Sequence, residues 1–197
     1  MKTRESGMPQ EEMWREFFDP EAILAALGLT PDVRDAVDFG CGYGTFSIPA
    51  AKIISGTLHG FDIDPAMVAE CERRARENGV HNARFHQRDF VATGAGLASE
   101  SVDYAMLFNI LHAEQPLLLL REAWRILAPG GRAAAIHWNY DPRTPRGPSM
   151  DIRPRPEDIR RWMEEAGFIV EKGIIDLPPY HYGLYGRKNS FREERKK

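Results

Sequence analysis

The sequence contains only two cysteines, Cys41 and Cys71, among its 197 residues. Two cysteines cannot form the disulfide framework of a small secreted domain, so we expect the reducing environment of the cytoplasm. The charged residues at the amino terminus are not followed by the apolar segment of a signal peptide. No apolar run approaches the length of a transmembrane helix. These absences argue against a secreted protein and against a membrane protein.

The chain also has little net charge. Its 26 basic and 29 acidic side chains give a formal charge of −3, so no overall positive field attracts nucleic acid. Hydrophobic residues make up 43% of the chain, and this fraction and the chain length are typical of one globular domain with a buried core. We assign this domain to residues 19–188. A flexible segment or lid helix at 1–18 precedes it, and a basic tail at 189–197 follows it.

Short apolar segments alternate with segments of helical periodicity along the chain. Helices begin at Asp19-Pro20 and at Asp64-Pro65, where the aspartate caps the helix and the proline occupies its first turn. Such alternation predicts βαβ units around a parallel sheet, which is an α/β fold. The predicted strands are residues 36–39, 57–61, 83–88, 101–108, 132–137, 168–177 and 181–187.

The most informative stretch is a strand that runs into a glycine-rich turn. The strand carries Asp38 near its end, and the turn places glycines at 40, 42 and 44, where the backbone can adopt positive φ and approach a ligand closely. A Walker loop needs a lysine that is absent here, and a dinucleotide fingerprint needs a glycine where Thr45 stands. An acid before the first glycine repels a pyrophosphate and suits an ammonium group. A tight turn without a ligand is the structural alternative.

Two further acids end the next two strands. Asp62 lies 18 residues beyond Gly44, where a carboxylate can accept both ribose hydroxyls in adenosine-binding α/β folds. Asp64 is better placed than Asp62 to cap the following helix, which leaves Asp62 for a ligand. Asp89 ends the third strand with Phe90 beside it. This pair suits an adenine amino group and ring edge, but a cap or a turn explains it just as well.

Four segments occur in an order that resembles a known family. Residues 37–44, 60–65, 88–90 and 127–131 resemble the motifs of class I S-adenosylmethionine-dependent methyltransferases. The resemblance is to the small-molecule branch, similar to the ubiquinone/menaquinone methyltransferases, and it covers roughly residues 19–188. These motifs are specific for the cofactor and carry little information on the methyl acceptor.

The resemblance implies a fold and a cofactor. The fold is a Rossmann-like seven-stranded mixed sheet in the order 3-2-1-4-5-7-6, with strand 7 antiparallel and helices on both faces. Residues 181–187 match strand 7. The cofactor is S-adenosyl-L-methionine, and S-adenosyl-L-homocysteine is its product.

The resemblance also implies how the cofactor is held. Asp38 and the glycine turn would surround the methionine moiety, Asp62 would bind the ribose, and Ile63 would pack on the adenine. Asp89 would accept from the adenine amino group, and the backbone of Asn109 would contact the methionine end. The implied cofactor-binding residues are Asp38, Gly40, Cys41, Gly42, Tyr43, Gly44, Asp62, Ile63, Asp89, Phe90 and Asn109.

Methyl transfer from a sulfonium requires a positioned nucleophile and the exclusion of water. A base is needed only where the nucleophile carries a proton. His112 and His137 follow the fourth and fifth strands, and we predict that they are auxiliary bases. A hydrogen-bonded structural role is the alternative for each. The other histidines lack metal-ligand spacing, so we predict no metal.

Residues 140–156 form a long loop with five prolines and four arginines. A loop of this length in a compact domain is usually functional or mobile. We predict that it is a substrate lid, with Tyr140, Arg143 and Arg146 contacting the acceptor. Arginine would favour an anionic or polar acceptor, whereas a loop that is basic only for solubility is the alternative.

Three function classes remain open from the sequence. We expect a small-molecule methyl acceptor. An RNA or protein methyltransferase is the second class, with the basic tail as its support. A cofactor-binding module without catalysis is the third.

Overall fold

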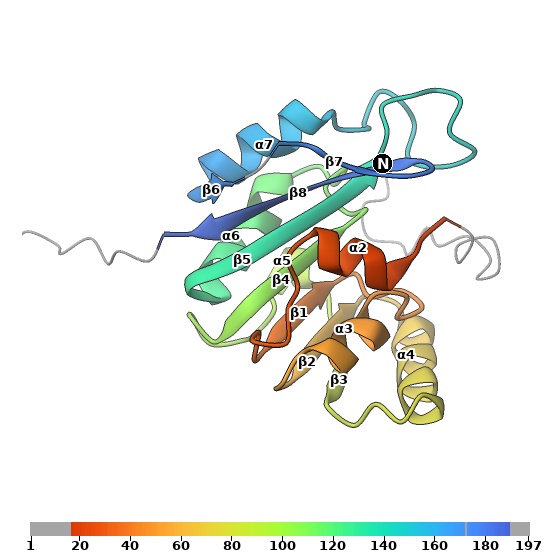
Figure 1. The fold of residues 1–197 in the computed structure, drawn as a ribbon, viewed down its shortest axis with the longest axis vertical. Helices are drawn as coiled ribbons and strands as arrows, with labels where there is room; N and C mark the ends of the chain where they lie inside the picture. The colour runs from red at the N-terminus through yellow and green to blue at the C-terminus, as the bar shows by residue number, and fades with distance from the viewer. Residues whose placement is uncertain (1–16, 172, 190–197) are drawn as a thin grey trace, which may run out of the picture.

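The computed structural model describes residues 17–171 and 173–189. They form a sheet of eight strands in the order β3-β2-β1-β4-β5-β8-β6, with β7 also paired to β8 (Figure 1). Strands β1 to β5 are parallel, and β8 runs antiparallel to β5, β6 and β7. The strands are β1 (Ala36–Phe39), β2 (Leu58–Asp62), β3 (Ala83–Gln87), β4 (Val102–Phe108), β5 (Leu127–Trp138), β6 (Phe168–Val170), β7 (Ile175–Leu177) and β8 (His181–Lys188).

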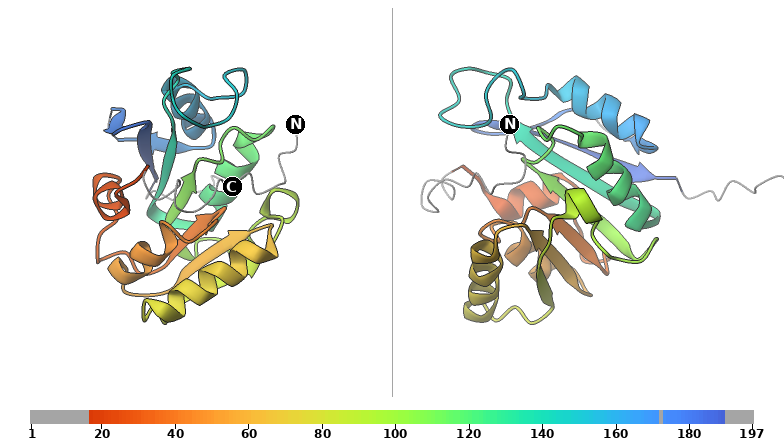
Figure 2. Two further views of the ribbon diagram at one scale, coloured as in Figure 1. Left: turned by 90° about the vertical axis from the view of Figure 1, so that its right-hand side faces the viewer. Right: turned by 180° about the vertical axis from the view of Figure 1, so that it is seen from behind.

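Helices cover both faces of the sheet (Figure 2). Helices α2, α3 and α4 contribute to the core on one face, and α5, α6 and α7 contribute to the core on the other. None of the helices in the described part of the chain is long and apolar enough to cross a membrane. The helices are α2 (Pro20–Ala26), α3 (Ser47–Ile53), α4 (Pro65–Glu77), α5 (Phe90–Thr93), α6 (Pro116–Ile126) and α7 (Pro156–Glu165).

The central strand β4 shows why the core has two layers. Tyr104 and Met106 face the side of α2 and α3, whereas Ala105 and Leu107 face the side of α6 and α7. All four side chains are fully buried. A parallel strand with helices on both faces has no polar side, so the residues of β4 that follow Asp103 form a continuous apolar run.

Two predicted helix starts are confirmed. The Asp19 carboxylate accepts a hydrogen bond from Ala22 N at 3.1 Å at the start of α2. The Asp64 carboxylate accepts one from Ala66 N at 2.8 Å at the start of α4. Each cap satisfies a backbone N–H that the helix itself leaves without a partner.

The predicted strand order and the antiparallel last strand are confirmed, with two differences. The predicted strand 168–177 is two short strands, β6 and β7, and both pair with β8. The strand predicted at 132–137 begins earlier, at Leu127, and its pairing with β4 has a register shift. Residues 1–16 and 190–197, which contain most of the predicted lid helix and basic tail, lie outside the described residues.

The strand directions bring the candidate residues to one edge of the sheet. The carboxyl ends of β1 to β5 share this edge, and the antiparallel β8 begins there. The loop of residues 139–155 leaves β5 at the same edge (Figure 1). Open α/β sheets bind ligands at the carboxyl ends of their strands, so we refer to this side as the carboxyl edge.

Candidate active site

The glycine turn follows β1 at the carboxyl edge. Gly40, Gly42 and Gly44 have φ values of 77°, 51° and 74°, in the left-handed region that other residues rarely adopt. A Cβ atom on Gly40 would lie 3.0 Å from Cγ2 of Ile110. The turn is fixed to β2, because the N–H groups of Gly40 and Cys41 donate to the Phe61 carbonyl oxygen at 2.8 and 2.9 Å. The glycines therefore meet both a conformational and a steric requirement.

Asp38 lies beneath this turn and is 3% exposed. The Ser47 hydroxyl, at the start of α3, donates to Asp38 Oδ2 at 2.5 Å. Burial raises the pKa of Asp38 to about 7, and repulsion from Asp62 adds to this effect while the Ser47 hydrogen bond opposes it. A nearby cation would favour the ionised carboxylate. The site therefore suits a positively charged ligand group.

Asp62 ties the glycine turn to the start of α4. Its Oδ2 accepts from Gly42 N at 2.9 Å, and its Oδ1 accepts from Asp64 N at 3.0 Å. Burial raises the pKa of Asp62, and the two backbone donors oppose that shift. A carboxylate has about four acceptor positions. Two bonds therefore leave acceptor capacity on each oxygen for ligand hydroxyls.

Two cysteines pack under the turn. The Cys71 thiol of α4 donates to the Gly42 carbonyl oxygen at 3.1 Å and lies 3.7 Å from Cys41 Sγ. Both thiols are buried and neither is in a disulfide. The contacts of Cys71, Ser47 and Ile110 with the turn and with Asp38 cannot be predicted from the local sequence, because they depend on the tertiary fold.

Asp89 and Phe90 have structural partners. Asp89 Oδ1 accepts from Ala92 N at 3.0 Å and caps the short helix α5. The Phe90 ring packs on the Phe39 ring, with centroids 5.3 Å apart. The capping alternative is thus observed. The contacts of Asp89 and Phe90 with adenine stay predictions. Cofactor contacts of Ile63 and Tyr43 also stay predictions. Ile63 is half-buried, and the Tyr43 carbonyl oxygen accepts from Arg74 at 2.7 Å.

Asn109 follows β4 with a φ of 57°. Its N–H donates to the Ile136 carbonyl oxygen at 2.8 Å. Among the residues that the structure describes, its side-chain oxygen and nitrogen are both buried without a hydrogen-bond partner, and so is the Thr45 hydroxyl beyond the glycine turn. Buried polar groups normally have partners, so each exception in a native structure calls for an explanation. A ligand at this edge would supply the missing bonds.

His112 and His137 meet at the carboxyl edge. Nδ1 of His112 lies 3.3 Å from Nε2 of His137. Burial lowers the pKa of His112 and lowers that of His137 well below its usual value. His137 is fully buried, so of the two rings only the half-buried His112 can reach an acceptor. The two predicted bases are therefore not equivalent, and His137 would act through His112.

The loop of residues 139–155 is organised around Arg153, which is 7% exposed. Its guanidinium donates to the carbonyl oxygens of Asn139 and Asp141 at 3.0 and 3.1 Å and to that of Pro148 at 2.8 Å. It also donates to the Thr144 hydroxyl at 2.6 Å. Arg153 thus holds the loop together and is not available for an acceptor.

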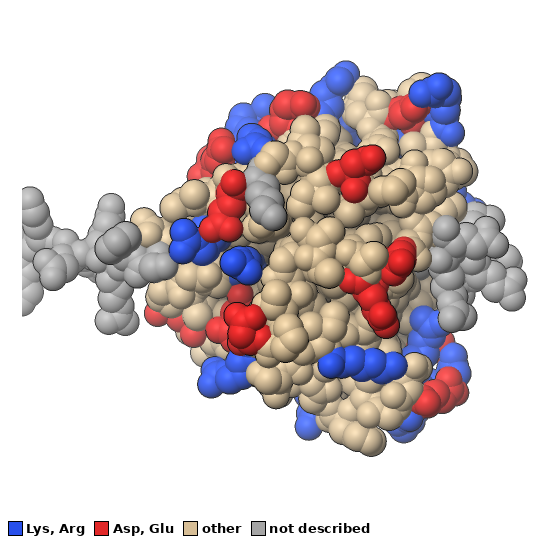
Figure 3. Space-filling view, in the orientation of Figure 1, with Lys and Arg blue, Asp and Glu red and all other residues tan. Residues whose placement is uncertain are grey.

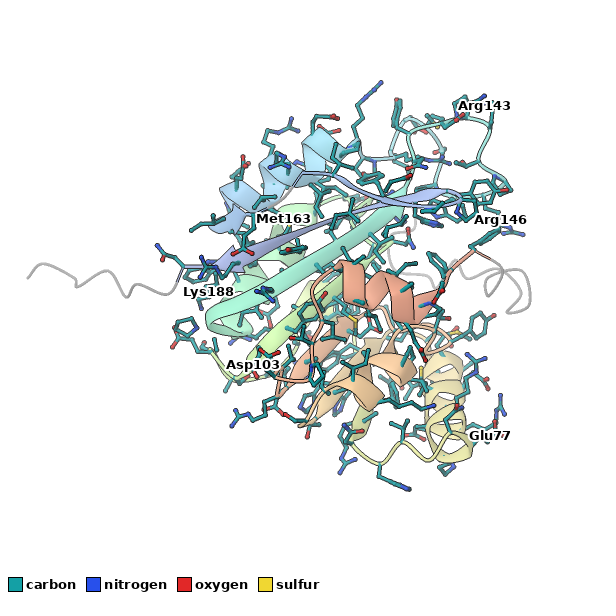
Figure 4. The ribbon with its side chains drawn as sticks, in the orientation of Figure 1. Glu77, Asp103, Arg143, Arg146, Met163 and Lys188 are labelled. Carbon is teal, nitrogen blue, oxygen red and sulfur yellow. The ribbon has the colours of Figure 1, made fainter. Side chains whose placement is uncertain are left out.

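Two other loop arginines also have partners within the loop. Arg143 forms an ion pair with Asp141 at 2.7 Å, and the Arg155 guanidinium lies 3.8 Å from the centroid of the Tyr140 ring. Arg143 and Arg146 both lie on the outer side of the molecule at the carboxyl edge (Figure 4). The charge of Arg143 is therefore compensated by Asp141, and the position of Arg155 is fixed by the Tyr140 ring.

A hollow of about 270 Å³ opens beside this loop. It lies between the residues that follow β5 and the turn that precedes β8, so it adjoins the carboxyl edge. The hollow is lined by Asn139, Asp141, Arg143, Thr144, Pro179 and Tyr180.

The chain is similar to known proteins in sequence. A protein family described as "Methyltransferase domain" matches residues 36–131. The 23S rRNA (uracil(1939)-C(5))-methyltransferase RlmD of Aeromonas salmonicida is 38% identical over 86 residues, which are 43% of this chain and 19% of that protein. The aklanonic acid methyltransferase DauC of a Streptomyces species (strain C5) is 30% identical over 134 residues, which are 66% of this chain and 60% of that protein. The chain thus spans less than two thirds of either relative.

The fold is also similar to that of solved structures. The crystal structure of a SAM dependent methyltransferase from Aquifex aeolicus matches with a TM-score of 0.78 at 23% identity, covering 87% of this chain and 90% of that chain. This likeness extends beyond the family match, which ends near the start of β5, and includes most of the sheet.

Proposed function

We propose that this chain is a class I S-adenosylmethionine-dependent methyltransferase, like the proteins that it resembles in sequence and fold, and that it transfers a methyl group from S-adenosylmethionine to a small-molecule acceptor. The observation that carries the proposal is the arrangement of Asp38, the glycine turn and Asp62 at the carboxyl edge. Asp62 retains acceptor capacity for ribose hydroxyls after binding two backbone donors. Asp38 provides a buried negative charge for an ammonium group once it is ionised.

The protein's part in the reaction is mainly positioning. When bound, S-adenosylmethionine supplies a methyl group on a sulfonium. The chain's own residues hold the reactants and exclude water, which can contribute several kcal/mol to the rate. Asn109, with its unpartnered amide, would hydrogen-bond a reactant at the end of β4. His112 would remove a proton from a protonated acceptor, oriented by His137 at 3.3 Å.

The loop of residues 139–155 would cover the acceptor. It follows β5, the strand next to β4, and borders the hollow at the carboxyl edge. We propose that Tyr140, Arg143 and Arg146 contact the acceptor from this loop. The compensated charge of Arg143 supports a polar acceptor more than a strongly anionic one.

The two relatives are named for different classes of methyl acceptor. The relative DauC is named for an acid of small-molecule type, whereas the relative RlmD is named for ribosomal RNA. The RlmD match covers 86 residues of this chain, so it supports RNA methylation only weakly. On the face drawn in Figure 3, lysine and arginine side chains are interspersed with aspartate and glutamate. A continuous basic surface, as expected for RNA binding, is not seen on that face.

Calorimetric titration with S-adenosylmethionine and S-adenosylhomocysteine tests the cofactor assignment. We expect both to bind the wild-type protein and Asp62→Asn to weaken binding about tenfold to a hundredfold, because a charge-assisted acceptor is lost. Asp64→Asn is the matched control, since an asparagine can still cap α4. Equal affinities in the wild type and Asp62→Asn would contradict the ribose assignment.

The acceptor class is tested separately. The conversion of S-adenosylmethionine to S-adenosylhomocysteine is measured in two reactions. One contains a small-molecule extract, and the other contains total RNA from which small molecules have been removed. Turnover with RNA but not with the small-molecule extract would show that RNA is the acceptor and would overturn the small-molecule proposal. Tight cofactor binding without turnover on either would favour a binding module.

A further inference from the structure

A row of aromatic rings lies behind the hollow at the carboxyl edge. Tyr180, which lines the hollow, stacks beside Trp138 with centroids 6.4 Å apart and planes 25° apart. Phe17 meets both rings edge-on, at 5.3 Å from Trp138 and 5.8 Å from Tyr180. Trp138 is 3% exposed and Phe17 is 7% exposed, whereas Tyr180 is half-buried. Tyr180 is thus the accessible end of this stack.

The row continues toward the glycine turn. The centroid of the His181 ring lies 4.2 Å from that of Trp138 and 4.4 Å from that of Phe18. Phe18 in turn packs edge-on against Phe46, which follows the turn, at 5.1 Å. The rings therefore connect the hollow beside β5 and β8 to the residues next to the proposed cofactor site.

His181 makes no side-chain hydrogen bond within the part of the chain that the structure describes. It is fully buried, and both of its ring nitrogens lack a hydrogen-bond partner in the described structure. Leaving a polar group buried without a bond is unfavourable, and such groups are commonly matched by a ligand.

Charge contributes little to this site. The charged groups that line the hollow are Asp141 and Arg143, and they neutralise each other in an ion pair at 2.7 Å. Arg153 is committed to the loop carbonyls, and Arg155 stacks on Tyr140. An anionic acceptor that paired with Arg143 would therefore first have to break the ion pair of Arg143 with Asp141.

We infer that the methyl acceptor is a planar aromatic compound with a neutral polar substituent, recognised mainly by the ring of Tyr180, which packs beside the buried Trp138, while Arg143 and Arg146 of the loop contribute less. This inference rests on the proposed methyltransferase function and narrows its acceptor class. Aromatic ligands gain from offset or edge-on contact with aromatic side chains beyond the burial of area. The neutral substituent would meet Asn139 or Tyr180 at the hollow, or His181 behind it.

The test compares three probes that share one bicyclic skeleton. 2-Naphthol is planar and neutral, decahydro-2-naphthol is saturated, and 2-naphthyl phosphate is planar and charged. Calorimetry is done on the full chain saturated with S-adenosylhomocysteine. We expect 2-naphthol to bind at least about tenfold more tightly than the saturated alcohol. We expect the phosphate to bind within about threefold of 2-naphthol.

Variants at Tyr180 identify the surface. Tyr180→Leu keeps apolar bulk without a ring, and we expect it to weaken 2-naphthol binding about tenfold, whereas Tyr180→Phe stays within about threefold of the wild type. Trp124→Ala removes a ring at the opposite edge of the sheet and serves as the control. Melting temperatures establish that each variant is folded.

Several outcomes would overturn the inference. These are equal binding of the saturated alcohol, a gain of tenfold or more for the phosphate, no effect of Tyr180→Leu, or no binding of any probe at millimolar concentration. The proposed function is judged independently in the same experiment. Binding of S-adenosylhomocysteine without binding of the probes rejects only the aromatic acceptor, whereas failure to bind S-adenosylhomocysteine rejects the cofactor assignment.

Discussion

The polar groups at the carboxyl edge of the sheet differ in their hydrogen bonding from those at the opposite edge, where β1 to β5 begin. We refer to this opposite side as the amino edge. At the amino edge, Asp103 accepts from the N–H groups of Arg34 and Asp35 at 3.1 and 3.0 Å. The buried Lys188 donates to the Leu127 carbonyl oxygen at 2.8 Å. At the carboxyl edge, Asn109 has a buried amide without a partner. Figure 4 shows Asp103 and Lys188 away from Arg143 and Arg146.

This difference in hydrogen bonding indicates that the two edges have different roles. A buried polar group that is satisfied by the protein itself contributes to stability, whereas one that is left unsatisfied lowers stability until a ligand binds. The amino edge therefore stabilises the fold, and the carboxyl edge is prepared for ligands. Arg153 is an exception, because it lies at the carboxyl edge and its donors are satisfied within the loop.

The largest expected effect is on stability at the amino edge. Asp103→Ala leaves two backbone N–H groups without their acceptor, so we expect the free energy of unfolding to fall by about 2 kcal/mol. Asp103→Asn keeps an acceptor oxygen and should lose less than half as much. Urea unfolding measures the loss. A parallel loss of affinity for S-adenosylhomocysteine would show that the two edges are not separate.

The exception at the carboxyl edge predicts a local effect. Arg153→Lys cannot bind carbonyl groups on several sides at once, because an ammonium group lacks the fork of a guanidinium. We expect limited proteolysis within residues 139–152 to become about tenfold faster, with a smaller change in global stability. Arg143→Lys, at an exposed ion pair, should leave the cleavage rate nearly unchanged. Equal cleavage rates in the two variants would argue against Arg153 as the organising residue.

Cofactor binding should depend on pH through Asp38. Its pKa of about 7 means that protonation competes with an ammonium ligand. Affinity for S-adenosylmethionine should therefore rise about eightfold from pH 6 to pH 7.5, as the carboxylate ionises. Calorimetry in buffers of different ionisation enthalpy would detect the proton that is released on binding.

The control for this pH dependence is Asp38→Asn, which has no titrating carboxylate. It should bind more weakly than the wild type at pH 7.5 and show little change in affinity between pH 6 and 7.5. An unchanged slope in this variant would assign the pH dependence to another group, such as Asp62, whose pKa is also raised by burial.

The smallest effect is expected at Asn109. Asn109→Gly removes an unpartnered amide and accommodates the φ of 57° without strain. We expect the unfolding free energy to be unchanged or up to about 1 kcal/mol higher. Methyl transfer should fall although S-adenosylhomocysteine still binds. A large loss of stability would show that the Asn109 amide has a structural role.

Sequence patterns predicted those parts of the fold that depend on local rules. The helix caps at Asp19 and Asp64 and the positive φ of the glycine turn follow from residue type alone. The split of the predicted strand 168–177 was missed, because its apolar residues read as one run, although Gly173 was an available signal. The early start of β5 was also missed, because it depends on pairing with β4.

The candidate site was predictable only in part. Asp38, the glycine turn and Asp62 form a pattern at fixed positions along the chain. Their supports, Ser47 and Cys71, contact them through the tertiary fold. The loop arginines were expected to face an acceptor, but their pairing with carbonyl groups, Asp141 and Tyr140 depends on how the loop folds back on itself. The spacing of residues along the sequence does not predict these partners of the loop arginines.

The sheet order has a consequence for how this protein could diversify. Strands β1 to β3 precede the residues proposed to bind the cofactor, β5 and β8 border the hollow, and β4 lies between the two groups. The segment after β5 can therefore change while the hydrogen bonds of the glycine turn stay intact. Replacing residues 139–180 with the corresponding segment of a relative should alter acceptor selectivity and preserve cofactor affinity. New specificity would then arise by exchange of one contiguous segment at the margin of the sheet.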